Sequence, residues 1–400
     1  MSYLAIARKY RPATFDEIVG QAHVTRTLRN ALANDRIHHA YLFCGARGVG
    51  KTTAARAFAK SLNCEQGPTP DPCGECVSCR EITSGSSPDL IEIDGASNNS
   101  VDDVRDLRDN VGYLPTRGKY KIYLVDEVHM LSKAAFNALL KTLEEPPRHV
   151  VFLFATTEPA KIPDTILSRV QRFDFKRIPV NAVVTRLASI AKAEGAALSE
   201  PSLRLIARAG EGSMRDSQSL LDKVISFAGT GEVSDAEVTE ILGLIDRSLL
   251  YRTLSGLVKG EPGVVLEVVD TVYGYGFELA QFTEELMEVV RNATFLRLSP
   301  DARKYVDIAD DEVEQLAATV DGVEPEQLQR LFSALIDVHD QVSRAARPRL
   351  VLEMAVARLA TPTPVVPVGA LIQRLEDLER RARHAKKPQG AGPNSRRPRH

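Results

Sequence analysis

The chain has 400 residues, of which 44% are hydrophobic and 26% charged, and its formal net charge at pH 7 is −2. These proportions exclude a mostly disordered, collagen-like or membrane-spanning protein, and the length indicates about two to four domains. The charge is uneven, because residues 380–400 hold eight basic and no acidic side chains, which leaves −10 for the rest. Taken alone, the net charge argues against a nucleic-acid partner, whereas the basic tail is either a solvated linker or an interaction segment.

An apolar strand is predicted at 40–44, followed by a glycine-rich loop and a helix at 51–62. The loop matches the GxxxxGK[ST] phosphate-binding pattern in its required strand–loop–helix context. Its glycines let backbone N–H groups face phosphates, and the helix N-terminus adds a favourable dipole. Lys51 is predicted to reach the β- and γ-phosphates, and Thr52 to bind Mg²⁺. The predicted nucleotide-binding set is Gly45, Ala46, Arg47, Gly48, Val49, Gly50, Lys51, Thr52 and Thr53.

Four of the five cysteines lie between that helix and the next predicted strand, at 89–94: Cys64, Cys73, Cys76 and Cys79. Four thiolates at the spacing C-x8-C-x2-C-x2-C suit a closed, tetrahedral structural zinc site without catalysis. Two disulfides and an iron–sulfur cluster are the alternatives, and a reducing cytosolic compartment favours zinc over disulfides. The fifth, Cys44, is expected to be a buried apolar residue.

A further apolar strand, at 120–126, ends in Asp126 and Glu127. Asp126 is predicted to help hold Mg²⁺ and Glu127 to polarise the attacking water. The alternative is an ordinary strand end with a helix-capping Asp, but with the phosphate loop upstream the pair indicates ATP hydrolysis. His129 would also fit a DExH helicase. Such a helicase usually needs a second α/β ATPase domain, and since none follows, a structural role is predicted for His129.

Strands at 40–44, 89–94, 120–126, 150–156 and 170–175 alternate with helices at 23–34, 51–62, 100–110 and 132–144. This alternation predicts an α/β domain with a mostly parallel sheet and its ligand at the carboxyl ends of the strands. Beyond Pro179 the pattern is helical, with a longer amphipathic stripe at Leu328, Leu331, Leu335, Val338 and Val342. Prolines then mark a linker, followed by one short amphipathic helix at 371–378.

Three segments resemble clamp-loader ATPases, most specifically the gamma/tau (DnaX) subunits of bacterial DNA polymerase III: 10–21, 126–131 and 139–147. The four-cysteine module strengthens the resemblance, which covers roughly residues 3–360. It implies an AAA+ domain at 1–178 with a zinc module at 64–79, a helical lid at 179–243 and an all-α collar for oligomerisation at 244–361. Residues 362–400 are expected to be a disordered linker and basic tail.

The resemblance also implies a function. ATP binding and hydrolysis would open the ring-shaped beta clamp and load it onto primed DNA, with ATP, Mg²⁺ and structural Zn²⁺ as cofactors. The chain would work in the bacterial cytoplasm, in a pentamer with further copies of itself and with delta and delta-prime subunits. Contacts with the polymerase alpha subunit and the helicase would involve residues beyond the collar. No polymerase active site is found in the sequence.

Further site residues follow from the resemblance. Tyr10, Val19 and Gly20 would pack near the adenine, Thr157 would sense the γ-phosphate, and Arg215 in the lid would touch the same nucleotide. Arg169 would be the arginine finger for ATP in the neighbouring subunit, although without the resemblance it is an ordinary surface ion-pair partner. The family's usual Ser-Arg-Cys triplet reads Ser168-Arg169-Val170 here, an apolar exchange expected to leave the guanidinium in place.

Lys141 is a candidate DNA phosphate contact, and the alternative is a solvated lysine.

Two other functions compete with the clamp-loader hypothesis. One is a helicase, and the other is a zinc scaffold that binds partners without hydrolysing ATP. The intact set of Lys51, Asp126 and Glu127 argues against the scaffold.

Overall fold

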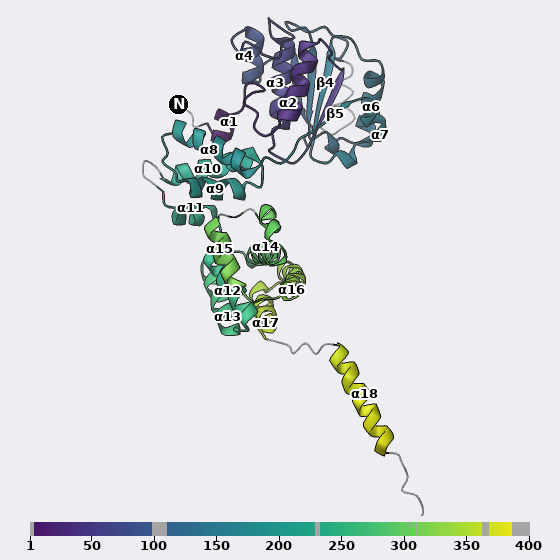
Figure 1. Ribbon diagram of the computed structural model, residues 1–400. Helices are drawn as coiled ribbons and strands as arrows, with labels where there is room; N and C mark the ends of the chain where they lie inside the picture. The colour runs from purple at the N-terminus through teal and green to yellow at the C-terminus, as the bar shows by residue number, and fades with distance from the viewer. Residues whose placement is uncertain are drawn as a thin grey trace, which may run out of the picture. The chain divides into compact units, whose positions relative to one another are not determined.

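The computed structural model describes residues 4–97, 110–228, 233–306, 308, 310–361 and 368–385. The chain forms two compact units, Met1–Leu244 and Ile245–His400, each of which is described by itself (Figure 1). The helix predicted at 100–110 lies outside the described residues except for Asn110. Within the described part, no helix combines the length and apolar character needed to cross a membrane.

The first unit contains a five-stranded parallel sheet in the order β2-β3-β4-β1-β5. Its strands are β1 (Ala40–Cys44), β2 (Leu90–Asp94), β3 (Lys121–Asp126), β4 (Val150–Thr156) and β5 (Gln171–Asp174). All residues of β1 and β4 are buried, as expected for the middle of a parallel sheet that is covered on both faces. The register pairs Cys44 with Thr156 and Asp94 with Asp126, so the carboxyl ends of four strands meet at one edge.

Helices cover both faces of this sheet (Figure 1). On one face α2 (Ala22–Ala33) and α3 (Lys51–Asn63) contribute Leu28, Phe58 and Leu62 to a core with alternate strand residues such as Phe43. On the other, α6 (Lys133–Glu144) and α7 (Asp164–Leu167) pack against the opposite alternation, such as Phe152. α4 (Val77–Ser84) packs on α3, and the short 3-10 helices η1 (Val128–Met130) and η2 (Pro159–Lys161) follow β3 and β4.

A separate helical cluster completes the first unit. It consists of α8 (Val180–Ala193), α9 (Glu200–Ala209), α10 (Met214–Ala228) and α11 (Asp235–Leu242), together with the N-terminal α1 (Ile6–Lys9). Ile6 is buried in the same core as Leu187, Ile206 and Leu221, and its backbone N–H donates to Oδ2 of Asp222 at 3.1 Å. The N-terminal segment therefore belongs to the helical cluster and leads from it to the sheet domain.

The described part of the second unit is helical. It contains α12 (Arg247–Lys259), α13 (Pro262–Gly274), α14 (Leu279–Leu298), η3 (Pro300–Tyr305), α15 (Asp310–Thr319), α16 (Pro325–Arg344) and α17 (Pro348–Ala360). The stripe predicted on α16 faces their common core, where four of its five members are buried and Leu331 is partly buried.

The helix predicted at 371–378 is longer, since α18 extends from Val368 to Ala385. This corrects the expectation of a disordered tail as far as Ala385. The physical reason is composition, because the stretch is rich in Leu, Glu, Arg and Ala, which are good helix formers. Ile372, Leu375 and Leu378 on this helix are exposed. Residues 386–400, which complete the basic tail, lie outside the described residues.

Candidate nucleotide site and cysteine centre

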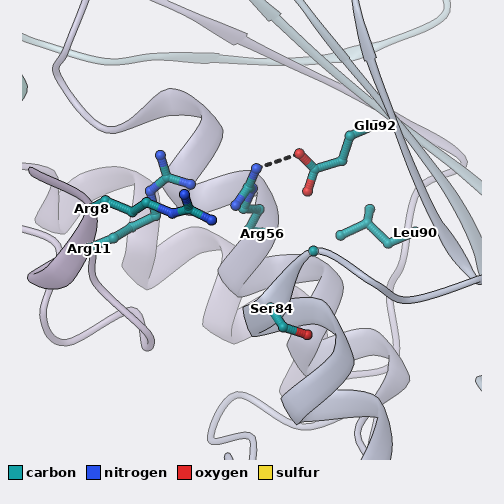
Figure 2. A pocket seen from close by; sticks show the side chains of 7 residues that line it. Arg8, Arg11, Arg56, Ser84, Leu90 and Glu92 are labelled. Carbon is teal, nitrogen blue, oxygen red and sulfur yellow. Dashed lines mark hydrogen bonds and ion pairs between the residues drawn. The ribbon is translucent and has the colours of Figure 1, made fainter. Parts of the chain in front are cut away.

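A cavity of about 400 Å³ lies at the carboxyl edge of the sheet, between the glycine-rich loop, the N-terminal segment and the helical cluster. Eleven of the predicted site residues line it: Val19, Arg47, Gly48, Val49, Gly50, Lys51, Thr52, Thr53, Asp126, Glu127 and Arg215. Arg8 and Arg11 line it too, and these two arginines also line a second cavity (Figure 2).

At two positions of the loop, another segment of the chain lies too close to the backbone for any residue other than glycine. At Gly48 (φ +73°), a Cβ atom would lie 1.9 Å from Oγ of Ser213, which begins the turn into α10. At Gly45 (φ +151°), it would lie 2.6 Å from the carbonyl oxygen of Phe175. A side chain at Gly48 would therefore push α10 away, while the backbone N–H of Arg215 donates to the Gly48 carbonyl at 3.3 Å. The loop and the helical cluster form one wall of the cavity.

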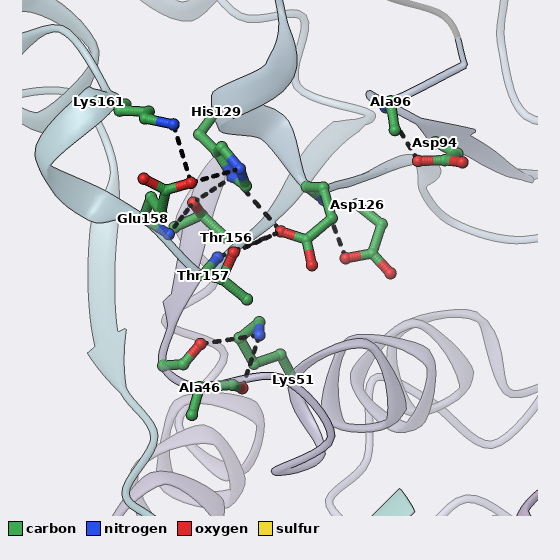
Figure 3. A network of polar contacts seen from close by, with 12 residues as sticks. Ala46, Lys51, Asp94, Ala96, Asp126, His129, Thr156, Thr157, Glu158 and Lys161 are labelled. Atoms are coloured by element: carbon green, nitrogen blue, oxygen red, sulfur yellow. Dashed lines mark hydrogen bonds and ion pairs between the residues drawn. The ribbon is translucent and has the colours of Figure 1, made fainter. Parts of the chain in front are cut away.

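Lys51, the first residue of α3, is buried at the base of the loop. Its Nζ donates to the carbonyl oxygens of Gly45 and Ala46, both at 2.9 Å (Figure 3). Burial lowers the pKa of Lys51, and the carboxylates of Glu127 and Asp126 oppose that shift. The ammonium group is thus partly desolvated, which strengthens its attraction for an anion in the cavity.

The two predicted Mg²⁺ ligands meet directly. Oγ1 of Thr52 donates to Oδ2 of Asp126 at 2.7 Å, and the other carboxylate oxygen of Asp126 accepts the backbone N–H of Glu127 at 3.0 Å. A hydroxyl and a carboxylate are hard oxygen donors, and Mg²⁺ usually takes one or two such protein ligands alongside water and substrate phosphates. The pair therefore fits a magnesium site at the end of β3.

Glu127 adopts a left-handed backbone conformation, with φ 45°, directly after β3. Its Oε2 accepts the backbone N–H and the Oγ1 hydroxyl of Thr157, at 3.3 and 3.0 Å, and lies 3.4 Å from Nδ1 of His129. His129 is only 6% exposed, contacts Oγ1 of Thr156 at 3.0 Å, and its Nε2 lies 3.3 Å from a carboxylate oxygen of Glu158 (Figure 3). The ends of β3 and β4 thus set the orientation of Glu127 together.

Sequence reasoning missed several lining residues. They come from the N-terminal segment, the end of the sheet domain and the helical cluster, and they are Ala5, Ala7, Arg8, Arg11, Pro12, Glu17, Ile18, Ile178, Arg186, Met214, Gln218 and Ser219. Arg8 and Arg11 could have been suspected, because they flank Tyr10, which was expected beside the adenine. The helical-cluster residues carry no contiguous motif, so no pattern along the chain identifies them.

Apart from the four cysteines, seven predicted residues do not line the cavity. Gly45 and Ala46 lie behind it as acceptors for Lys51, Gly20 packs close to Ile178, and Thr157 acts on Glu127. The hydroxyl of Tyr10 donates to Oε1 of Glu194 at 2.5 Å, because α1 packs with the helical cluster and directs Tyr10 towards the end of α8. The expected place of Tyr10 beside an adenine stays a prediction. Arg169 and Lys141 complete the seven.

Arg169 follows α7 and its C-cap residue Ser168, does not line the cavity and is held by its own chain. Its guanidinium donates to the Thr165 carbonyl at 2.7 Å, to Oγ of Ser168 at 3.0 Å and to Oε1 of Glu144 at 2.8 Å. The pair with Glu144 is partly exposed, with 33% and 50% side-chain exposure. Val170 packs against the apolar core on the α6 side of the sheet. Lys141 is exposed on α6.

The sulfur atoms of Cys64, Cys73, Cys76 and Cys79 all lie within 4.8 Å of one another. Zinc–sulfur bonds of ~2.3 Å in a tetrahedron place sulfur atoms about 3.8 Å apart. The observed Cys73 contacts of 3.6 Å to Cys64 and 4.0 Å to Cys79 match that spacing, and the cysteines form no disulfide. The four cysteines therefore fit a zinc site.

Backbone N–H groups point at these sulfurs. Cys73, Cys76 and Cys79 donate to the Sγ atoms of Cys64, Cys73 and Cys76, respectively, at 3.3–3.4 Å. Donation from the backbone of Cys76 and Glu75 lowers the pKa of Cys73 to about 7, whereas burial raises that of Cys79. The N–H groups stabilise thiolate charge, as a metal-binding thiolate requires.

Three protein-family models match successive parts of the chain. "DNA polymerase III, delta subunit" matches residues 20–179, and "DNA polymerase III clamp loader subunit, ATPase lid domain" matches residues 182–230. "DNA polymerase III subunits gamma and tau domain III" matches residues 233–375. Among solved structures, the RuvB Holliday junction branch migration motor of Thermotoga maritima covers 62% of this chain and 80% of its own, at 17% identity and a TM-score of 0.46.

Curated relatives match nearly the whole chain. DNA polymerase III subunit tau of Bacillus subtilis is 41% identical over 394 residues, which are 96% of this chain and 69% of that subunit. The Escherichia coli tau subunit is 44% identical over 92% of this chain and 57% of its own, and the gamma/tau subunit of Mycobacterium tuberculosis is 40% identical over 94% and 66%. This chain thus spans only part of each relative. These findings confirm the resemblance and the fold class: the chain belongs to the gamma/tau (DnaX) family of DNA polymerase III clamp-loader subunits, with a parallel-sheet AAA+ domain, a helical lid and a helical C-terminal domain.

Proposed function

We propose that the chain is the ATP-hydrolysing motor subunit of a bacterial clamp loader, which opens the beta sliding clamp and places it on primed DNA. It acts in the cytoplasm within a pentamer of further copies, delta and delta-prime subunits, and contacts with the polymerase alpha subunit or helicase belong to residues beyond the collar. The observation that carries this proposal is the single cavity that brings Lys51, the Thr52–Asp126 pair, Glu127 and the lid residue Arg215 together.

Each residue has a role that follows from its chemistry. Lys51 contacts the β- and γ-phosphates, and Thr52 and Asp126 hold Mg²⁺, which when bound neutralises charge on the phosphate oxygens. Glu127 orients the attacking water and accepts its proton. By the family resemblance, Thr157 senses the γ-phosphate, and Arg215 in the lid touches the same chain's nucleotide.

Arg169 acts in trans, on ATP held by the neighbouring subunit. Arg169 does not line the cavity of its own chain, and this supports a role at the ATP of another chain. Its guanidinium would exchange Glu144 for a phosphate oxygen, and a partly exposed ion pair contributes only ~0–1 kcal/mol. The exchange therefore costs little, and hydrolysis becomes dependent on assembly.

The test is DNA-stimulated ATP turnover of the assembled complex carrying Arg169→Ala. An arginine finger contributes roughly 10³- to 10⁵-fold, so turnover should fall by about that factor while nucleotide affinity is retained. Arg172→Ala is the matched control, because Arg172 is a nearby, half-exposed arginine paired with Asp174 on β5. Unchanged turnover in the Arg169 variant would exclude the trans role.

A mixing experiment separates action in trans from action within one chain. Assemblies that contain both Arg169→Ala and Lys51→Ala copies create interfaces in which an intact loop faces an intact finger. Turnover of the mixture should exceed that of either variant alone. No recovery on mixing would mean that both residues serve the same chain's ATP.

Two alternative functions have their own tests. In the described part of the chain the second unit is entirely helical, which does not supply the second α/β domain that a helicase usually needs. Strand separation by the purified chain, without clamp or delta subunits, would nevertheless favour a helicase. ATP binding without turnover in the full assembly would favour a zinc scaffold.

A further inference from the structure

A second cavity, of about 460 Å³, lies beside α3 on the side of β2. Its lining contains three arginines and one carboxylate, and it consists of Arg8, Arg11, Arg56, Ser84, Gly85, Leu90 and Glu92. Arg8 and Arg11 extend from the α1 segment towards Arg56, which lies between them and Glu92 (Figure 2). We call this the arginine cavity. Lys51, Thr52 and Asp126 do not line it, and Arg56 and Glu92 do not line the nucleotide cavity.

Arg56 is only partly satisfied by the protein. One terminal nitrogen of its guanidinium donates to Oε2 of Glu92 at 2.5 Å, with 27% and 30% of the two side chains exposed. Its Nε is buried and has no hydrogen-bond partner among the described residues. A buried donor without an acceptor destabilises the fold, because it has lost its hydrogen bonds to water and forms none within the protein.

Arg8 and Arg11 have no ion-pair partner among the described residues. Neither side chain forms a hydrogen bond or an ion pair there, and Glu92, which pairs with Arg56, is the one carboxylate that lines the cavity with them. Burial lowers the pKa of Arg11, and the positive charges of Arg56, Arg215 and Arg8 lower it further, opposed only by Glu92. A surplus of positive charge is therefore concentrated in a partly desolvated space, which favours a bound anion.

We propose that the arginine cavity binds a small phosphate-type anion, inorganic phosphate or pyrophosphate, separately from the nucleotide site. Guanidinium groups offer planar pairs of N–H donors that match phosphate oxygens, and three of them converge here. Monatomic anions use this donor geometry less well. Three arginines that line one cavity also fit a compact anion better than an extended nucleic-acid backbone, which is contacted along a groove.

Anion binding should affect the nucleotide site, because Arg8 and Arg11 line both cavities. An anion in the arginine cavity neutralises the charges of Arg8 and Arg11. It thereby weakens their attraction for nucleotide phosphates in the adjacent nucleotide cavity. Coupling of this kind is reciprocal, so nucleotide should weaken anion binding by the same factor. The inference does not depend on clamp loading, because it concerns the chain by itself.

The test is calorimetric titration of the full chain, saturated with ADP and Mg²⁺ so that the nucleotide cavity is filled, with pyrophosphate and with phosphate. Arg56→Met keeps the apolar stem of the side chain and should weaken pyrophosphate binding by about tenfold or more, as expected for the loss of charge-assisted hydrogen bonds. Glu92→Gln removes the competing carboxylate and should strengthen binding several-fold. Arg80→Met is the control, since Arg80 is an exposed arginine on α4 outside the cavity lining.

Opposite changes in the Arg56 and Glu92 variants, with an unchanged Arg80 variant, would support the proposal. If Arg56→Met failed to fold, shown by a lost thermal transition, the increase in Glu92→Gln would still decide. The proposal is overturned if the ADP-saturated chain binds no pyrophosphate, or binds it equally in all variants. It is also overturned if an oligonucleotide without terminal phosphate binds in an Arg56-dependent manner and pyrophosphate does not, because the site would then serve nucleic acid.

Discussion

The carboxylate of Glu127 owes its orientation to residues outside its own strand. Both contacts to Thr157 reach the same oxygen, Oε2, and His129 lies beside that oxygen without belonging to the cavity lining. The left-handed backbone at Glu127 is unfavourable for a residue with a side chain, so these surroundings must hold it. Under the proposed function, in which Glu127 accepts a proton from water, Thr157 and His129 are its positioning residues.

Thr157→Val tests this positioning. Valine keeps the shape of threonine but removes the hydroxyl that donates to Glu127 at 3.0 Å. We expect kcat for ATP to fall about ten- to a hundredfold, the kinetic equivalent of one hydrogen bond to a charged group, while ATP affinity changes little. Steady-state kinetics and nucleotide titration measure both quantities. Thr165→Val on α7, an exposed threonine, should leave kcat unchanged. Equal kcat in Thr157→Val and the native protein would contradict the role.

At the level of single residues, sequence reasoning succeeded where one contiguous motif supplies the chemistry. Thr52 follows the glycine loop and Asp126 ends a strand of the same parallel sheet, so the contact between these two side chains was predictable. Arg8 and Arg11 were missed because their effect depends on a cavity between three elements. The hydrogen bond between Tyr10 and Glu194 was not predictable for a similar reason, since the two residues lie 184 positions apart.

The cysteine centre joins two helices of the AAA+ domain. Cys64 directly follows α3, and Cys76 caps the N-terminus of α4, where its sulfur accepts the backbone N–H of Cys79 at 3.4 Å. α3 begins with Lys51, so a metal at this centre fixes the far end of the helix that carries the nucleotide-binding lysine. Zinc should therefore stabilise the domain and contribute nothing to the chemical step.

Cys76→Ser separates the metal from the helix cap. Serine is a good N-cap residue, so α4 keeps its capping acceptor while one thiolate is lost. We expect the zinc content of the purified protein to fall from about one atom per chain to well below one, with a lower Tm. Cys44→Ala is the control for cysteine loss, because Cys44 lies in β1 and should not affect zinc. Native zinc content in the Cys76 variant, measured by elemental analysis, would rule out this centre as the metal site.

At the level of elements, all five strands were predicted to within one residue at each end. β1, β3 and β4 are largely apolar runs, whereas β5 is mostly polar and buries only Phe173. The strand order was not predictable, since it depends on which neighbours pair across the sheet. α1 was missed because four residues are too few for a periodic pattern, and it is stabilised by packing on α10. The end of α18 was underestimated because its last residues are polar on every side.

At the level of the whole molecule, the net charge of −2 says little about partners. It is the sum of −10 for residues 1–379 and +8 for residues 380–400. DNA binding depends instead on where basic side chains cluster in the assembled complex. A subunit with an acidic surface can still contact DNA through a few lysines and helix N-termini that line an inner face. The interaction then exists only after assembly, which no single-chain charge count can reveal.

Lys141→Ala in the assembled complex tests one such contact. Each phosphate contact to duplex DNA contributes about 0.9 to the slope of log K against log[salt], so the slope should become shallower by about that amount per copy in contact. Lys133→Ala is the matched control, because Lys133 is also exposed on α6 and its loss changes the total charge equally. If both variants shift the slope alike, Lys141 acts only through the general field of the protein. A shift in Lys141→Ala alone would place the DNA backbone against the C-terminal half of α6.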